Sequence, residues 1–168
     1  QMGGAYSVFA NGGYRISPHL IAKITDVKGN VLSQAEPAVA GETAERAIDP
    51  RNAFVMTTML RDVVAYGTAT RAQSLGRKDL AGKTGTTNEN VDAWFCGYTP
   101  VIVGIAWIGH DQPRTLGTNE TGAVAALPIW ISFMQRALKG QREQPIDVPP
   151  GVVQVRINDA TGLRDDTS

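Results

Sequence analysis

The stretch "LAGKTGTTNENVDAWFCGYTPVIVGIAWIG", residues 80–109, contains three strand-like runs separated by short polar connections. The runs cover residues 80–87, 92–98 and 101–109. Connections this short favour antiparallel pairing, because a parallel return needs about a dozen residues or more. The stretch therefore predicts an antiparallel meander, with Lys83 on its first strand and a tight reversal at Thr99-Pro100 before its last.

Helical patterns precede this meander. Apolar residues recur at helical spacing in residues 1–11 and stop at Gly12. A longer helix should begin at Asp49, a favourable N-cap, with Pro50 at the first helical position, and should end before Gly67. We expect one face of this helix, methionines included, to pack in the core; it consists of Met56, Met59, Leu60, Val63 and Val64.

Another helical pattern follows the meander, after a loop rich in Gly, Thr and Asn. Pro128 lies near its start and Gly140 at its end. Its apolar stripe, which should pack on the sheet, consists of Trp130, Phe133, Met134, Ala137 and Leu138. Together these elements predict an α+β fold in which an antiparallel sheet is flanked by helices.

Two segments between the first helices have weaker patterns. Residues 20–32 are typical of a β-hairpin whose turn is Lys28-Gly29-Asn30, with the glycine and the asparagine supplying positive φ. Residues 33–47 are polar and rich in alanine without a period, so we expect a surface loop there.

The amino-acid composition of the chain changes at Gln141, where the last predicted helix has ended. The run "QREQPIDVPPG" is typical of a proline-rich linker, and "VVQVRI", residues 152–157, is typical of one strand of a further unit. We therefore divide the chain into a main unit, residues 1–144, and a proline-rich linker with a strand-like C-terminal extension, residues 145–168.

Composition excludes several classes of partner. Sixteen basic and sixteen acidic residues cancel, and no run of Lys or Arg with interleaved aromatic residues occurs, so no nucleic-acid partner is expected. The longest apolar run, residues 101–109, is far shorter than the ~20 residues that span a bilayer. We expect no membrane helix in these residues.

The residues that most often bind metals are scattered. Cys96 is the single cysteine, which excludes an internal disulfide, and its apolar neighbours predict a small core residue. His19 and His110 stand alone and are expected in a loop or at a strand end. No cluster has zinc-ligand spacing, so we predict neither a metal nor a cofactor.

The Gly-Lys-Thr at residues 82–84 also ends phosphate-binding P-loops, but the rest of that motif is missing. A P-loop has four residues between its two glycines, whereas five separate Gly76 from Gly82. The apolar strand that should precede it and the helix that should follow it are missing as well. The other motif with these letters is Lys-Thr-Gly on a strand, which is found in penicillin-binding enzymes.

The residues on this strand suit an anionic ligand. Gly82 and Gly85 carry no side-chain bulk, so a ligand can approach the backbone. Thr84 and Thr86 lie two residues apart, which puts both hydroxyls on one face, where together they can hold a carboxylate. Lys83 lies on the other face of the same edge and favours anions. Alternatively, Gly-Lys-Thr-Gly-Thr-Thr is only an exposed turn.

Other groups near this strand could contribute to the predicted site or hold it in place. Positive charge upstream comes from Arg71, Arg77 and Lys78. A free backbone N–H at the strand edge can also face a developing oxyanion. We predict that Asp92 and Trp94 are structural and hold the second strand, the carboxylate by hydrogen bonding and the ring by burial.

Four stretches together resemble one family over residues 1–140: "AYSVFANGGYRISPHLIAKITDVKGNVL", "AYGTATRA", "AGKTGTTNENVDAWFCGYTP" and "ALPIWISFMQRAL". The resemblance is to the C-terminal half of the transpeptidase domain of class A, bifunctional penicillin-binding proteins, type 1a of Gram-negative bacteria. It implies the penicillin-recognising, serine β-lactamase-like fold, a five-stranded antiparallel sheet between helices. The last three strands and the C-terminal helix of that fold are expected here.

The resemblance also implies roles. Lys83 would belong to the hydrogen-bond network around a serine nucleophile, and the N–H of Thr86 would be an oxyanion donor. Thr84 and Thr86 would bind the terminal carboxylate of a peptidoglycan stem peptide or of a β-lactam. Gly85 and Thr87 complete the expected substrate-binding set.

The chain departs from the family pattern in one respect. The nucleophile and its base come from Ser-x-x-Lys and a proton relay from Ser-x-Asn, and these 168 residues contain neither motif. The resemblance therefore implies a partial active site, inactive without the upstream half of the same domain. In the family, a glycosyltransferase domain and a membrane anchor precede it, on the periplasmic side of the bacterial inner membrane.

Two other functions remain open at the level of sequence. A serine β-lactamase shares the fold and the Lys-Thr-Gly strand, but the linker and strand-like tail after Gln141 argue against it. A noncatalytic interaction module could keep the fold without the chemistry.

Overall fold

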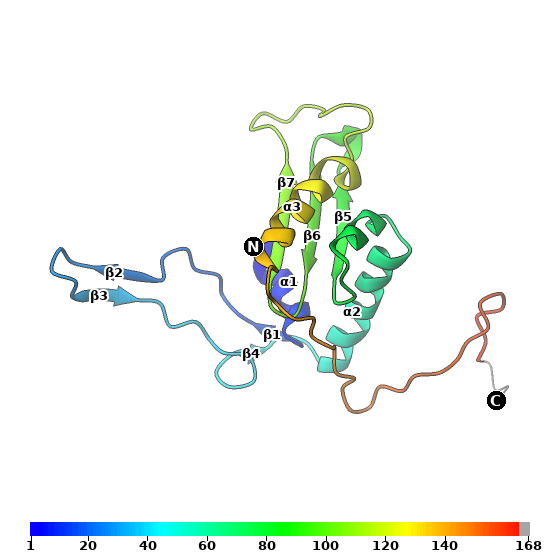
Figure 1. Ribbon diagram of the computed structural model, residues 1–168, viewed down its shortest axis with the longest axis horizontal. Helices are drawn as coiled ribbons and strands as arrows, with labels where there is room; N and C mark the ends of the chain where they lie inside the picture. The colour runs from blue at the N-terminus through cyan, green and yellow to red at the C-terminus, as the bar shows by residue number, and fades with distance from the viewer. Residues whose placement is uncertain (165–168) are drawn as a thin grey trace.

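A three-stranded antiparallel sheet forms the centre of the computed structural model, which describes residues 1–164 (Figure 1). Its strands are β5 (Ala81–Thr86), β6 (Ala93–Tyr98) and β7 (Val103–Ile108), in the order β5-β6-β7. Lys83 pairs with Cys96, which in turn pairs with Ile105. The predicted meander is confirmed, and its bounds differ by one or two residues from those expected.

Helices cover both faces of this sheet. Gly97 and Tyr98 are neighbours in β6 and so point to opposite faces. Trp130 of α3 (Leu127–Ala137) donates from Nε1 to the Gly97 carbonyl, whereas Tyr6 of α1 (Met2–Ala10) packs against the Tyr98 ring at 6.3 Å. α1 and α3 therefore lie on opposite faces, as Figure 1 shows, which confirms the α+β fold.

A row of glycines explains how α3 approaches so closely. Gly82, Gly97 and Gly104 pair across the three strands and form a strip without side chains, and the Trp130 indole lies over Gly97 and Gly104. A Cβ atom at Gly97 would lie 2.7 Å from the Trp130 ring. The indole also donates to the Gly104 carbonyl at 3.1 Å, so the buried N–H is satisfied.

The long helix α2 (Pro50–Ala65) lies beside β5 (Figure 1). Asp49 caps it by accepting from the Arg51 N–H, as predicted. The predicted buried face is wrong in part, because Met56 and Met59 are 39% and 58% exposed. The buried residues are instead Ala53, Thr57, Leu60 and Val64.

The shift of the buried face has a physical reason. α2 lies alongside β5, and its buried Thr57 also meets Tyr98 of β6, so only one stripe of the helix is covered and the methionines lie outside it. The same holds for Phe133 of α3, predicted to pack on the sheet but 53% exposed. A sequence stripe shows which residues are apolar and cannot show how much of a helix its neighbours cover.

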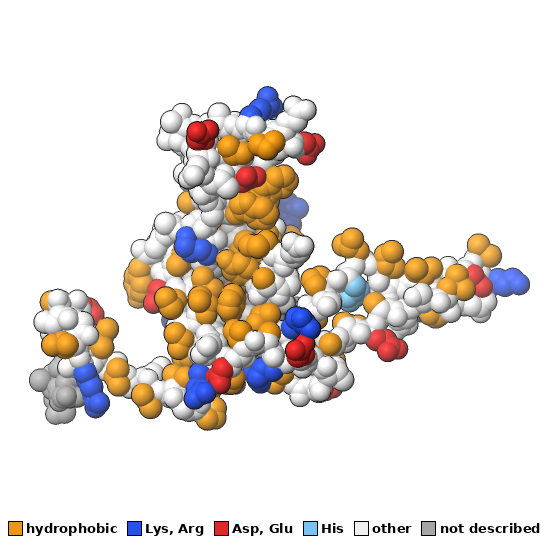
Figure 2. All heavy atoms as spheres, turned by 180° about the vertical axis from the view of Figure 1, so that it is seen from behind, with side chains coloured by type: hydrophobic (Ala, Val, Ile, Leu, Met, Phe, Trp, Pro, Cys, Tyr) orange, Lys and Arg blue, Asp and Glu red, His pale blue; other side chains and the backbone are white. Residues whose placement is uncertain are grey.

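The predicted hairpin forms from β2 (Lys23–Thr25) and β3 (Val31–Gln34), which project from the body (Figures 1 and 2). Gly29 has a φ of +85°. Asn30 does not share this conformation; its side chain instead donates to the Asp26 carboxylate at 2.8 Å. The prediction of positive φ at Asn30 is wrong, because the Asp26 carboxylate already holds the turn.

The segment expected to be a surface loop, residues 33–47, is partly strand. β3 extends to Gln34, and β4 (Glu45–Arg46) pairs with β1 (Tyr14–Arg15). Arg15 and Glu45 form an ion pair across this ladder. A two-residue strand has no periodicity to detect, so only pairing with the distant segment creates it.

The remaining short helices are η1 (Thr70–Leu75), η2 (Asn88–Asn90) and η3 (Gly122–Ala126), the last a π-helix that runs into α3. After α3, residues 141–149 return along the body of the molecule. Within residues 152–157 the structure has only an isolated bridge, from Ile157 to Arg164, in place of the expected strand. No helix in residues 1–164 is long and apolar enough to cross a membrane.

Candidate active site on the lysine strand

The outer edge of β5 has no strand partner among residues 1–164. Thr87 donates its N–H to the Asp92 carbonyl at 3.1 Å, which extends the pairing of β5 with β6. Backbone groups of an antiparallel strand alternate between its two neighbours. The N–H groups of Thr84 and Thr86 therefore point away from β6, to the open edge.

Thr84 lies at the centre of a small polar cluster. Its hydroxyl oxygen is 2.8 Å from that of Thr68, in the turn after α2. The Lys83 ammonium donates to the Thr84 carbonyl at 2.9 Å and approaches its hydroxyl at 3.3 Å. Although Lys83 leaves the strand on the opposite face, its long side chain thus folds over the edge and brings its charge beside Thr84.

Thr86 lies on the same face as Thr84 but has a different anchor. Its hydroxyl accepts a hydrogen bond from the Gly122 N–H at 3.0 Å, at the start of η3. A hydroxyl has one hydrogen and two lone pairs. The Thr86 side chain is therefore oriented while its hydrogen remains available for a ligand.

The other two predicted substrate-binding residues, Gly85 and Thr87, make structural contacts beside the site. Gly85 pairs with Trp94, and a Cβ atom on it would lie 3.2 Å from the Trp94 Cβ. The Thr87 hydroxyl accepts from the Asp92 N–H at 2.8 Å and so braces the connection to β6. The hydroxyl hydrogen of Thr87 is still free to donate.

The connection from β5 to β6 is held in an unusual conformation. Glu89 and Asn90 have φ values of +59° and +52°, the left-handed region that side chains rarely adopt. The Asn90 side chain donates to the carbonyls of Gly117 and Thr118, both at 2.9 Å. This places the long loop before η3 against the end of the lysine strand.

Asp92 and Trp94 lie as structural residues would. The Asp92 carboxylate accepts from the Trp107 Nε1 at 2.9 Å, which joins β7 to the end of the connection. The half-buried Trp94 ring packs on Trp107, with ring centroids 5.8 Å apart. The predicted hydrogen bonding of the carboxylate is confirmed.

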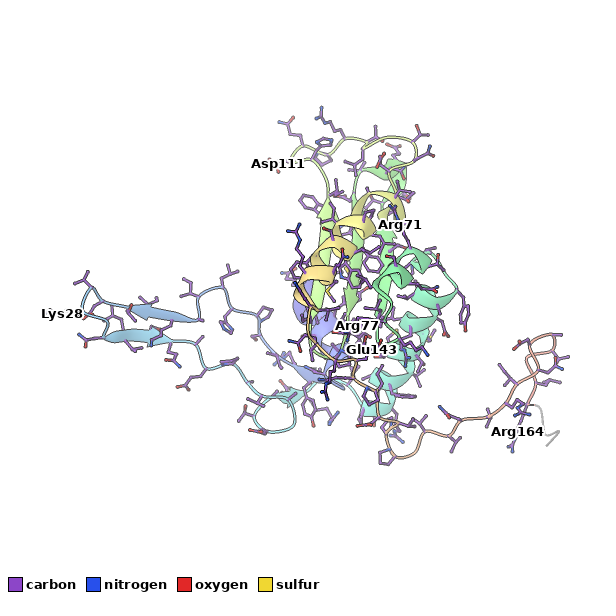
Figure 3. All side chains as sticks on the ribbon, viewed as in Figure 1. Lys28, Arg71, Arg77, Asp111, Glu143 and Arg164 are labelled. Carbon is purple, nitrogen blue, oxygen red and sulfur yellow. The ribbon has the colours of Figure 1, made fainter. Side chains whose placement is uncertain are left out.

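One of the upstream cations is already paired. Arg77 forms an ion pair with Asp79 at 2.6 Å and donates to the carbonyl of Gln141 at 2.8 Å. The Asp79 carboxylate beside it raises the pKa of Arg77. Figure 3 shows Arg77 beside Glu143. Its role is to hold the segment after α3, and its charge is largely neutralised there.

The remaining candidate residues carry no chemistry in the structure. Cys96 is buried, as predicted, and burial raises the pKa of its thiol. His110 lies two residues after the end of β7, with its Nδ1 3.4 Å from Arg114. Within residues 1–164, no group of three or more His, Cys, Asp or Glu side chains is arranged to hold a metal ion.

Sequence reasoning missed Thr68, Gly122 and Asn90. Thr68 is 16 residues from Thr84, and Gly122 is 36 residues from Thr86. No periodicity links residues so far apart, and a threonine or glycine in a loop has no distinguishing pattern. The stretch "AYGTATRA" contains Thr68, but only the folded chain shows which of its residues meets the lysine strand.

A family model for the penicillin binding protein transpeptidase domain matches residues 1–127. The chain belongs to this transpeptidase family. Penicillin-binding protein 1A of Neisseria gonorrhoeae is 52% identical over 149 residues, which cover 89% of this chain and 19% of the relative. Penicillin-binding protein 1A of Pseudomonas aeruginosa is 41% identical over 207 residues, covering 96% and 25%. The predicted resemblance to type 1a penicillin-binding proteins is confirmed.

Solved structures agree with this assignment. Penicillin-binding protein 1A of Haemophilus influenzae matches with a TM-score of 0.92 and 32% identity, covering 99% of this chain and 30% of that one. The imipenem acyl-enzyme complex of penicillin-binding protein A from Mycobacterium tuberculosis matches with a TM-score of 0.57, 22% identity and coverage of 81% and 30%. The latter shows the shared penicillin-binding transpeptidase fold. The chain spans about a fifth of the length of the Neisseria relative.

Proposed function

We propose that this chain supplies the Lys-Thr-Gly side of a peptidoglycan D,D-transpeptidase active site that works by an acyl-serine mechanism and is a target of β-lactams. The observation that carries the proposal is the open edge of β5. There the outward N–H of Thr86, the hydroxyls of Thr84 and Thr86 and the Lys83 ammonium lie on one short piece of strand.

Each group has a task in this chemistry. The Thr84 and Thr86 hydroxyls, with Gly85 and Thr87 as the adjoining backbone, bind the terminal carboxylate of a stem peptide or of a β-lactam. The Thr86 N–H stabilises the oxyanion that forms when the serine attacks, where one donor is worth roughly 2.7–4 kcal/mol. Lys83 joins the hydrogen-bond network around the nucleophile and favours the negatively charged ligand.

We propose that the serine, its lysine base and the relay residues come from the upstream half of the same domain, through Ser-x-x-Lys and Ser-x-Asn motifs. The outer edge of β7 supports this partner, because it has no strand against it among residues 1–164. Beside that edge lies an apolar groove of about 370 Å³, lined by Ile105, Trp107, Ile129 and Phe133 among others. A further strand of the expected five-stranded sheet would cover it.

From the resemblance to class A penicillin-binding proteins, we propose that the complete protein acts on the periplasmic side of the inner membrane, held by an anchor upstream of these residues. The complete protein would also carry a peptidoglycan glycosyltransferase domain. Its substrates are stem peptides, and no cofactor takes part. Penicillin-binding proteins 1A from several Gram-negative bacteria support this assignment, since they align with most of the chain.

Labelling by a fluorescent penicillin tests the proposal. Lys83→Met in the complete protein keeps an unbranched side chain, one atom shorter, and removes its charge and its hydrogen-bond donors, so labelling should slow by about tenfold or more. Lys23→Met, on the projecting hairpin, is the matched control and should label at the normal rate. Normal labelling of Lys83→Met would contradict the role of the lysine.

The same assay separates the alternatives. A noncatalytic interaction module of this fold would take up no label. A serine β-lactamase would release its label within seconds to minutes and hydrolyse excess penicillin, whereas a transpeptidase keeps the acyl group.

A further inference from the structure

Two neighbouring groups, the Lys83 ammonium and the Thr68 hydroxyl, restrict the hydrogen bonds that the Thr84 hydroxyl can make with a ligand. A threonine hydroxyl carries one hydrogen and two lone pairs. Lys83 has only hydrogens to offer, so its ammonium, 3.3 Å away, occupies one lone pair of the Thr84 oxygen. The Thr68 hydroxyl lies 2.8 Å from the same oxygen and can act either as donor or as acceptor.

The direction of the hydrogen bond between Thr68 and Thr84 decides what Thr84 offers to a ligand. If Thr68 donates, both lone pairs of Thr84 are occupied and its single hydrogen is left for a third group. That third group must be an acceptor. If Thr84 donates to Thr68 instead, Thr84 presents a lone pair, which repels an anion. A ligand carboxylate therefore selects the arrangement in which Thr68 donates.

Thr68 is held firmly enough to act in this way. The N–H groups of Gly67 and Ala69, on either side of it, both donate to the Val63 carbonyl at 3.1 Å. Ala69 is fully buried, and the Gln73 amide ties the following helix to the carbonyls of Val64 and Ala65. The turn after α2 is thus braced on both sides, while the Thr68 side chain itself is exposed.

We propose that Thr68 is a positioning residue that makes Thr84 a hydrogen-bond donor and so gives the site its preference for ligands with a carboxylate. The inference rests on the proposed function, and it adds a residue from outside the lysine strand. A purely structural role for Thr68, as a tie between the turn and β5, would affect charged and neutral ligands alike.

The test uses the complete protein and two probes, benzylpenicillin and its methyl ester, which differ only in the carboxylate. Thr68→Val keeps the shape of the side chain and removes its hydroxyl. One neutral hydrogen bond is worth about 1 kcal/mol, so acylation by the acid should slow about fivefold, while acylation by the ester stays within about twofold. Thr68→Ser retains a hydroxyl and should restore the rate with the acid.

Thr58→Val is the matched control, because Thr58 is a half-buried threonine of α2 whose hydroxyl donates to the Val55 carbonyl within its own helix. Equal slowing of acid and ester in Thr68→Val, no slowing at all, or failure of Thr68→Ser to restore the rate would each overturn the inference. Thr68→Ala serves in the same comparison if Thr68→Val does not fold. If the unsubstituted protein is not acylated by either probe, the proposed function itself fails.

Discussion

Thr86 illustrates how one residue can serve both the ligand and the fold. Its hydroxyl accepts from the Gly122 N–H, its hydrogen is available to a carboxylate, and its own N–H faces the open edge of β5. Gly122 is buried, and a Cβ atom on it would overlap the carbonyls of Gly85 and Trp94. The start of η3 is therefore positioned by the side chain that we propose binds the substrate.

We expect Thr86→Val in the complete protein to slow acylation by a carboxylate-bearing β-lactam about ten- to a hundredfold, because a charge-assisted hydrogen bond worth about 1.5–3 kcal/mol is lost. Since the Gly122 N–H also loses its acceptor, the melting temperature should fall slightly. Thr86→Ser keeps both hydrogen bonds and should behave almost normally in both measurements. A normal acylation rate for Thr86→Val would exclude the carboxylate-binding role.

The buried Tyr98 should make the free energy of unfolding depend on pH in the alkaline range. Its ring is buried, its hydroxyl lies 2.9 Å from that of Thr57, and burial raises the pKa of Tyr98 to about 12. The unfolded chain loses this proton near pH 10, while the folded chain keeps it until about pH 12. The contribution to stability is therefore full below pH 10 and is lost as the pH rises toward 12.

We expect the free energy of unfolding to fall between pH 10 and 12, by at most about 1.4 kcal/mol per pH unit from this group. Denaturant unfolding at pH 8 and pH 11 measures the difference. Tyr98→Phe should reduce the slope, whereas Tyr66→Phe, at an 85% exposed position, should leave it unchanged. An undiminished slope in Tyr98→Phe would show that another group is responsible.

At the scale of elements, the sheet and α3 are matched to one another by the strip of glycines under Trp130. Gly97 lies between Gly82 and Gly104 on the neighbouring strands, so the indole contacts the backbone directly. The two carbonyls that its N–H reaches belong to this strip. Side chains here would separate the helix from the sheet that carries Lys83.

We predict that Gly97→Ala destabilises the fold by about 1–3 kcal/mol, since the added methyl group would lie 2.7 Å from both Phe95 and Trp130. Gly3→Ala is a suitable comparison, because a Cβ atom there meets nothing within 4 Å and lies in a helix, where alanine is favoured by roughly 0.5–1 kcal/mol. Thermal unfolding of both variants checks the prediction. Equal melting temperatures would mean that α3 can move away at no cost.

At the scale of the whole molecule, apolar surface is exposed beside β7 and on α2. The outer edge of β7 and the groove beside it are open, and Val55, Met56 and Met59 are exposed on α2. The space-filling view shows hydrophobic side chains gathered over the body of the molecule (Figure 2). These surfaces are where we expect the upstream half of the transpeptidase domain to pack.

This arrangement predicts the outcome of a complementation experiment. The 168-residue chain by itself should not be labelled by a fluorescent penicillin, because none of its serines has a lysine three positions later. Addition of the upstream half should restore labelling, with the label on the upstream fragment only. Stable label on this chain would refute the proposed origin of the nucleophile.

The sequence alone was sufficient for the elements with strong local signals. Strand runs with short connections predicted the β5-β6-β7 meander, and Asp49 with Pro50 predicted the start of α2. The motif around Lys83, together with three other stretches within residues 1–140, was enough to identify the family. Such signals can be detected because each lies within a continuous run of residues.

Only the tertiary structure decided which residues meet across long stretches of chain. Thr68 beside Thr84, Gly122 beside Thr86, the pairing of β1 with β4, and the exposure of Met56 and Phe133 have no local cause. A hydroxyl or an apolar side chain suits many environments, and its actual environment depends on how distant elements pack. The chemical groups of the lysine strand can therefore be predicted from the local sequence, whereas the orientation of its hydroxyls depends on contacts with distant segments.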